Sequence, residues 1–112
     1  MKDDSIYLQH ILDSIDKIEN YTESYDEQSF QHDTLVQDGV IRQIEIIGEA
    51  VKQLSTELKD KHIHVPWKDI AGMRDKLVHH YFGVDIKKVW LTVVEDIPFL
   101  KKEVLQIFDD LA

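Results

Sequence analysis

The chain has no cysteine among its 112 residues, and it has only 4 glycines and 2 prolines. The absence of cysteine excludes disulfides, thiol nucleophiles, cysteine-ligated zinc and iron–sulfur clusters. The low glycine and proline content excludes collagen-like and linker-rich sequence. No apolar run approaches the roughly 18 residues of a membrane-spanning helix, and no apolar signal region follows Met1. We therefore expect a cytoplasmic protein without membrane contact.

The residues that are present predict one packed domain over residues 1–112. Hydrophobic residues make up 43% of the chain and charged residues 31%, which provides enough apolar surface for a core. The net charge of −9 argues against a protein that coats nucleic acids, because such proteins neutralise phosphates with lysine and arginine. Residues 59–88, however, hold seven bases against four acids, and four of the six histidines. This segment is the place to look for phosphate chemistry, although unevenly charged solvated faces are the alternative.

Apolar residues recur at three-to-four spacing along the first half of the chain, as they do in amphipathic helices. The spacing predicts helices at about 4–24 and about 33–58, the second with Asp33 as its N-cap. Gly39 and Gly48 lie inside the second pattern, where glycine is unfavourable for a helix. They indicate that a neighbouring helix approaches the backbone closely.

The second half of the chain continues this pattern with more interruptions. Residues 59–65 are polar and are predicted to form a loop. A third helix is predicted over 66–82, ended by Gly83 in the left-handed conformation. A fourth helix, capped by Asp85, is expected to kink or restart near 96–98, because a proline there lacks an amide hydrogen. No segment alternates in the manner of a strand.

These elements predict an all-α fold, an antiparallel bundle of four to five helices. The apolar stripes are wide and include adjacent apolar pairs such as Ile46–Ile47 and Val93–Val94. A bundle this small seldom covers so much apolar surface alone, and we therefore expect a symmetric homodimer.

The run from Gly72 to Gly83 concentrates Arg74, His79, His80 and Tyr81 in an otherwise acidic chain. Arginine binds phosphate oxygens with a bidentate fork, and histidine exchanges protons near neutral pH. Metal-free cleavage of RNA needs a base for the 2′-hydroxyl, an acid for the leaving 5′-oxygen and a cation for the transition state. The alternative is an ordinary helix with an Arg–Asp pair, two solvated histidines and a core tyrosine.

Helix geometry limits how these residues can meet. Arg74 and His79 are five residues apart, about 140° around a straight helix. They can converge only if the helix loosens near His79, if the long arginine side chain sweeps around, or if a second subunit completes the site. A metal site has less support: His62 and His64 stand two apart in the expected loop, and the pattern adds no further ligand at a suitable interval.

The signature Arg74-x4-His79-x-Tyr81 resembles that of the HepT family, within the HEPN superfamily of small helical proteins. The resemblance extends over nearly the whole chain. It includes the run Ile44–Ala50, the segment Pro66–Arg74 and the later Val84-Asp85 and Trp90.

The resemblance implies the toxin of a prokaryotic toxin–antitoxin system, a homodimer with the motif in a cleft between subunits. It implies a metal-independent ribonuclease without a cofactor, with Arg74 and His79 as catalytic residues. The implied partner is a minimal, MntA-like nucleotidyltransferase antitoxin that transfers AMP to Tyr81. Since a modification target must be accessible, we predict that the Tyr81 hydroxyl lies at the surface or in the dimer cleft.

Five further residues are candidates for support of this site: Arg42, Glu45, Glu49, Lys76 and His80. The two glutamates are expected to pair with Arg42 or Arg74 and orient it, or else to be surface carboxylates. Two readings compete with the ribonuclease: a non-catalytic module that binds a nucleotide or its partner, and a purely structural adaptor.

Overall fold

The computed structural model describes residues 3–79 and 83–111, and most of these residues are helical. The elements in chain order are α1 (Asp4–Thr22), α2 (Glu27–Gln31), α3 (Thr34–Gln53), α4 (Thr56–Lys61), α5 (Trp67–Ala71), α6 (Met73–Leu77), β1 (Val78–His79), β2 (Gly83–Val84), α7 (Ile86–Leu91), the π-helix η1 (Thr92–Asp96) and α8 (Ile97–Leu111). The all-α class is thereby confirmed. Within the described ranges, no helix is long and apolar enough to cross a membrane.

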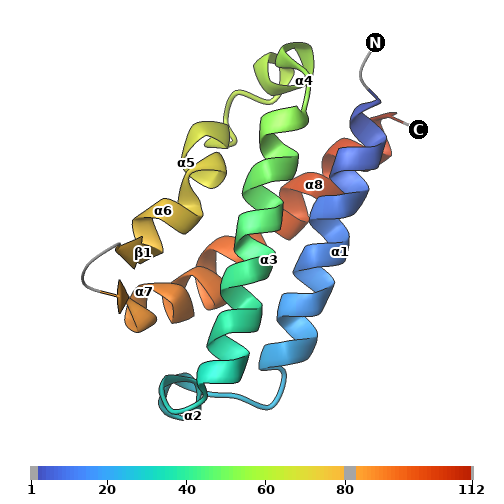
Figure 1. The fold of residues 1–112 in the computed structure, drawn as a ribbon. Helices are drawn as coiled ribbons and strands as arrows, with labels where there is room; N and C mark the ends of the chain where they lie inside the picture. Colours follow the sequence, from blue (N-terminus) through green and yellow to red (C-terminus); the bar gives the residue numbers. More distant parts are fainter. Residues whose placement is uncertain (1–2, 80–82, 112) are drawn as a thin grey trace.

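The two longest helices, α1 and α3, lie antiparallel and side by side, and α8 crosses behind them (Figure 1). After α3 and α4, the chain runs back along the flank of α3 through α5 and α6. The hairpin β1–β2 then leads it into α7. The start of α1 and the end of α8 lie at the same end of the molecule.

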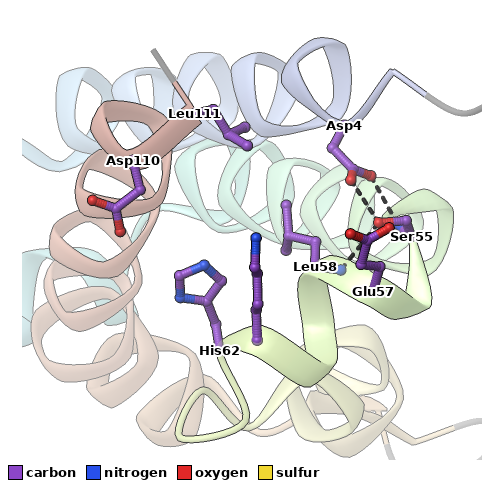
Figure 2. Close-up of a pocket in the computed structure, with 8 residues that line it drawn as sticks. Asp4, Ser55, Glu57, Leu58, His62, Asp110 and Leu111 are labelled. Atoms are coloured by element: carbon purple, nitrogen blue, oxygen red, sulfur yellow. Dashed lines mark hydrogen bonds between the residues drawn. The ribbon is translucent and has the colours of Figure 1, made fainter.

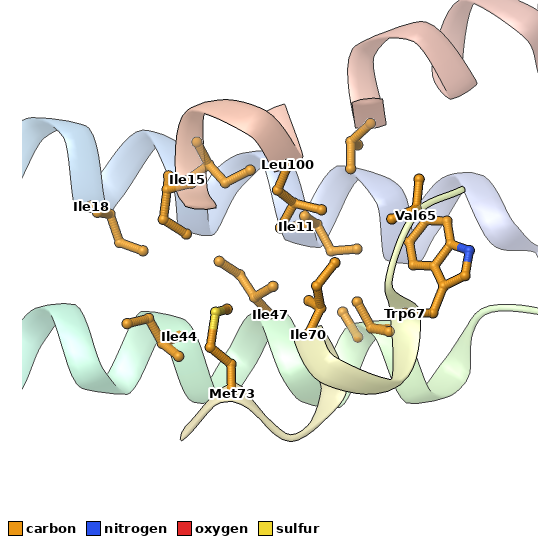
Figure 3. Packing of buried hydrophobic residues seen from close by; sticks show 14 of the residues in the cluster. Ile11, Ile15, Ile18, Ile44, Ile47, Val65, Trp67, Ile70, Met73 and Leu100 are labelled. Carbon is orange, nitrogen blue, oxygen red and sulfur yellow. The ribbon is translucent and has the colours of Figure 1, made fainter. Parts of the chain in front are cut away.

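The core lies between these helices and is built from the predicted apolar stripes. Figure 3 shows Ile11 and Ile15 of α1 facing Ile47 of α3, with Leu100 of α8 beside them. These four side chains are at most 2% exposed. Burial of one such side chain stabilises the fold by about 1.5–3 kcal/mol.

The helices predicted over 4–24 and 33–58 correspond to α1 and α3 and begin where the sequence predicts. The second of them ends early. Asp33 caps α3 by accepting a hydrogen bond from the amide of Val36 at 3.1 Å. The predicted helix over 33–58 stops at Gln53, since Ser55 is extended and caps a new helix, α4. The Ser55 amide and hydroxyl also donate to the Asp4 carboxylate, at 2.8 and 2.6 Å. The predicted loop over 59–65 is consequently helical as far as residue 61.

The third predicted helix, over 66–82, is wrong in its second half. It is divided at Gly72 into α5 and α6, and it ends at Leu77, after which the chain is extended. Gly83 does have a positive φ of 78°, but it belongs to β2 and serves the hairpin rather than a helix end. The hairpin is closed by the pairs Val78–Val84 and His79–Gly83, a short pairing that the sequence pattern does not indicate.

The fourth helix is capped by Asp85, as predicted, and restarts at Ile97. The interruption takes the form of the π-helix η1, in which the Ile97 amide donates to the Thr92 carbonyl, five residues back. This wider turn moves the hydrogen-bond register just before Pro98, whose nitrogen cannot donate.

Candidate active site

Arg74 is placed by the contact of α5 and α6 with α3. Gly48 of α3 makes this contact possible, because a Cβ atom there would lie 2.9 Å from the backbone oxygen of Ala71. Real Cβ atoms essentially never approach an oxygen so closely. The predicted close approach at Gly48 is thus confirmed, and it brings Arg74 over the face of α3 that carries Glu45.

Glu45 lies between two arginines. Its Oε1 accepts a hydrogen bond from Arg42 Nη1 at 2.5 Å, and its Oε2 lies 3.4 Å from Arg74 Nε. The contact between Glu45 and Arg74 is an ion pair and not an aligned hydrogen bond, since the buried Nε atom of Arg74 has no hydrogen-bond partner among the described residues. The predicted pairing of Glu45 is therefore confirmed for both arginines.

The Arg74 guanidinium remains accessible despite these contacts. Its side chain is 40% exposed, and Nη1 lies 3.5 Å from Asp75 Oδ1. Arg74 lines an open hollow of about 240 Å³ between α3 and α6. Ion pairs at this exposure contribute little to stability, about 0.2–1 kcal/mol. The contact with Glu45 is therefore not a main source of stability for the fold.

Two other predicted support residues, Glu49 and Lys76, form ion pairs with residues other than the two arginines and Glu45. Glu49 lines the same hollow but pairs with Lys52, at 3.2 Å, and not with either arginine. Lys76 pairs with Asp69 across the α5–α6 junction, at 3.2 Å, and lines a different hollow.

His79 follows Arg74 by five residues in the chain, and α6 ends between them, at Leu77. The backbone of His79 belongs to β1, and the Asp85 amide donates to the Leu77 carbonyl at 2.9 Å, which holds the hairpin to the end of α6. The helical relation of 140° between Arg74 and His79 therefore does not apply. The His79 side chain, His80 and Tyr81 lie outside the described residues, so their predicted roles and the position of the Tyr81 hydroxyl remain predictions.

The two loop histidines have structural contacts. His64 Nε2 lies 2.7 Å from Glu103 Oε2 on α8, and the His62 ring stands edge-on to His64, with centroids 6.2 Å apart. In the part of the chain that the structure describes, no three histidine, aspartate or glutamate side chains gather as metal ligands do.

Sequence reasoning missed the contacts that join distant segments. Asp4 and Ser55 meet at the rim of a hollow of about 340 Å³ that Glu57, His62 and Asp110 also line (Figure 2). Neither this pair nor the pair of His64 with Glu103 leaves a periodic signal, because the partners are separated by 51 and 39 residues.

The geometry is that of a small helical protein with a fixed arginine beside a histidine-bearing hairpin, and comparisons with known proteins identify the class. Residues 11–107 match the family described as ribonuclease HepT-like, and the chain belongs to this family. The predicted resemblance is confirmed. No solved structure matches the chain significantly.

Three relatives carry related names. A Methanocaldococcus jannaschii protein named "Gamma-glutamylcyclotransferase and putative RNase" is 52% identical over 98% of this chain, which spans only 50% of that protein. A second protein of that organism, named "Putative RNase", is 44% identical over 98% of this chain and 95% of its own length. The "Probable ribonuclease HepT" of Thermococcus cleftensis is 47% identical over 85% of this chain and 86% of its own length.

Proposed function

We propose that the chain is a metal-independent ribonuclease that acts as a homodimer, the toxin of a prokaryotic toxin–antitoxin pair. Membership of the HepT-like family supports RNA as the substrate. The observation that carries the proposal is Arg74: its guanidinium is directed by Glu45, stays 40% exposed, and stands beside the hairpin that contains His79.

In the proposed reaction a neutral imidazole of His79 takes the proton of a ribose 2′-hydroxyl. The 2′-oxygen attacks phosphorus, and the bond from phosphorus to the 5′-oxygen breaks. The leaving oxygen takes a proton from the protonated histidine of the second subunit, and Arg74 stabilises the charge on the non-bridging oxygens. The products are a 2′,3′-cyclic phosphate and a 5′-hydroxyl, so the step consumes neither water nor a metal ion.

The proposal is tested by RNA cleavage with purified variants. His79→Ala is expected to lower the cleavage rate by about 10²–10⁴-fold, because a positioned acid–base group is lost. His64→Ala is the matched control, since His64 contacts Glu103 on α8 and lies outside the hollow of Arg74. EDTA is expected to leave the rate unchanged. A His79→Ala protein that cleaves RNA at the wild-type rate would exclude the mechanism.

We further propose that a minimal nucleotidyltransferase antitoxin silences the enzyme at Tyr81. The tyrosine oxygen would attack the α-phosphorus of ATP and release pyrophosphate, leaving a bulky, negatively charged adenylate that repels an RNA phosphate. Intact-mass spectrometry of the chain co-expressed with the antitoxin should detect one or more adenylates. Tyr81→Phe should carry none and stay active in the antitoxin's presence, whereas adenylate on Tyr81→Phe would place the modification elsewhere.

One observation favours a second candidate, a module that binds a nucleotide or its partner without cleavage. Arg74 is flanked by the carboxylates of Glu45 and Asp75, which offset its charge toward RNA. This candidate predicts nucleotide-dependent association with the antitoxin and intact RNA in the assay above.

A further inference from the structure

A second hollow lies on the other side of α3 from the hollow of Arg74. It opens between α1 and α3 and is called the α1–α3 hollow below. Its volume is about 300 Å³, at the lower end of the range for ligand pockets. Figure 1 shows α3 between α1 on one side and α5 and α6 on the other, so the two hollows flank the same helix. The reaction proposed at Arg74 makes no use of the α1–α3 hollow.

Aromatic and aliphatic side chains give the α1–α3 hollow a surface for a flat ring. The Tyr7 and His10 rings of α1 stand at 87° to each other, with centroids 6.0 Å apart. Both line the hollow, together with Ile46 and Ala50 of α3. In the corner between two such rings, a planar ligand can lie flat on one ring and turn its edge to the other. Proteins that bind single-stranded nucleic acid stack nucleobases on aromatic side chains in this way.

Arg42 adds a cation to the α1–α3 hollow. Its side chain lines the hollow and is 65% exposed. Among the described residues that line this hollow, Glu49 is the carboxylate, and Lys52 offsets its charge at 3.2 Å. A guanidinium binds phosphate oxygens with two parallel hydrogen bonds. An exposed arginine beside an aromatic corner therefore matches a phosphate followed by a base.

Two glutamates of α3 stand between the α1–α3 hollow and the hollow of Arg74. Glu49 lines both hollows. The two carboxylate oxygens of Glu45 contact Arg42 and Arg74, at 2.5 and 3.4 Å. The two guanidinium groups are thus held on either side of one carboxylate, close enough for successive phosphates of one strand. A free nucleotide would occupy only one of the two hollows, so this arrangement favours a strand as the ligand.

We infer that the α1–α3 hollow binds a nucleobase of single-stranded RNA, one nucleotide away from the phosphate that is cleaved. Arg74 contacts the scissile phosphate, Arg42 contacts the adjacent phosphate, and the next base stacks in the corner of Tyr7 and His10. The inference rests on the proposed ribonuclease and adds a substrate class to it. The bases of a double helix are stacked and paired, and they cannot enter a hollow on the protein surface.

The aromatic corner is tested by binding of a 2′-O-methyl RNA strand of about ten nucleotides, a length typical of single-strand sites. This RNA lacks the 2′-hydroxyl nucleophile and stays intact, and fluorescence anisotropy with the full chain measures its Kd. Tyr7→Leu is expected to raise Kd by about tenfold through loss of stacking, and Tyr7→Phe should stay within about twofold of the wild type because it keeps the ring. Phe99→Leu is the matched control, since Phe99 is 44% exposed on α8 and lies outside this hollow.

The phosphate contact of Arg42 is tested by the salt dependence of binding. Arg42→Gln should raise Kd by about tenfold and reduce the slope of log Kd against log salt concentration by about 0.7, the value for one phosphate of a single strand. Tyr7→Leu should leave this slope unchanged. Lys101→Gln is the charge-matched control, because Lys101 of α8 also pairs with a glutamate and lies outside both hollows.

Urea unfolding checks that all these variants are folded. Kd values of Tyr7→Leu and Arg42→Gln within about twofold of the wild type would overturn the assignment, since each variant removes one predicted contact. A double-stranded RNA of the same sequence that competes as well as the single strand would also overturn it.

Cleavage of unmodified RNA by the same samples separates this site from the proposed function. In Tyr7→Leu and Arg42→Gln, KM for a long strand should rise with Kd while kcat changes by less than about threefold, because the contacts lie away from the reacting atoms. The effect of Arg42→Gln on KM should disappear with a dinucleotide, which has a single phosphate.

The outcomes for the site and for the enzyme are distinct. If RNA is cleaved but neither variant differs from the wild type, the site is wrong and the ribonuclease stands. If binding follows the predictions but no sample cleaves RNA, the site stands and the ribonuclease is wrong. A wild type that neither binds nor cleaves RNA would overturn both.

Discussion

At the scale of single residues, we expect Glu45 to orient Arg74 rather than to stabilise the fold. Glu45→Gln removes the charge that faces Arg42 and Arg74, while the side chain keeps its shape. We expect kcat for RNA cleavage to fall by about tenfold or more through misplacement of Arg74. The free energy of unfolding should change by less than about 1 kcal/mol, because the pairs are exposed.

Glu49→Gln is the control for this prediction, because Glu49 lines the same hollow but pairs with Lys52. Steady-state kinetics and urea unfolding of both variants provide the two readouts. Equal activity in the two proteins would mean that Glu45 does not direct the arginine.

A second prediction at this scale concerns the glycine beneath α5. Gly48→Ala should destabilise the protein by about 1 kcal/mol or more, since the added methyl meets the backbone oxygen of Ala71 and outweighs the gain in helix propensity. Gly72→Ala should change the stability by less than about 0.5 kcal/mol, because its Cβ would lie 3.6 Å from the nearest atom, the Lys68 oxygen, and its φ of −98° suits alanine. Urea unfolding compares the two, and a larger loss in the Gly72 variant would contradict the packing.

At the scale of elements, we expect the start of α3 to be sensitive to acid. The Tyr25 hydroxyl donates to Asp33, and this bond, with the Val36 amide, lowers the pKa of the Asp33 carboxyl from its ordinary value of 3.8. A lowered carboxyl pKa stabilises the folded state above pH 3.8, and this contribution is lost as the pH falls through the folded value. Asp33→Asn should therefore lose stability less steeply below pH 4 than the wild type.

Urea unfolding followed by circular dichroism between pH 2 and pH 6, values chosen to span roughly the carboxyl titration, measures this slope. Tyr25→Phe removes the first of the two donors and should also flatten the acid limb, to a smaller extent. Parallel acid limbs in the wild type and Asp33→Asn would show that the cap is not a source of the pH dependence.

The limits of sequence-based prediction also appear at the scale of elements. Caps with a side-chain acceptor, at Asp33 and Asp85, are local signals and were predicted correctly. The break at Ser55 depends on Asp4, which lies 51 residues away, and the end of α6 depends on the pairing of Val78 with Val84. Apolar spacing carries neither contact, and it therefore extended both helices too far.

The candidate site shows the same division. The contact of Glu45 with Arg42 could be predicted because the two residues lie one turn apart on α3. The second contact of Glu45, to Arg74, requires the packing of α6 on α3. Glu49 pairs with Lys52 at the same three-residue spacing that joins Arg42 to Glu45, so the local pattern indicates this pair as well.

At the scale of the whole molecule, association couples stability to concentration. If the chain forms the proposed homodimer, mass action favours the folded dimer, and the thermal midpoint should rise with protein concentration. Scanning calorimetry over a hundredfold range of concentration, about what mass action needs for a clear shift, tests this. A concentration-independent wild type would indicate a folded monomer.

The hydrogen bond from the Asp85 amide to the Leu77 carbonyl has one more consequence. This bond and the two strand pairs tie the described ends of the hairpin to each other and to the end of α6. If Tyr81 is adenylated as proposed, we therefore expect the adenylate to inhibit by blocking RNA, while α6 and α7 keep their arrangement.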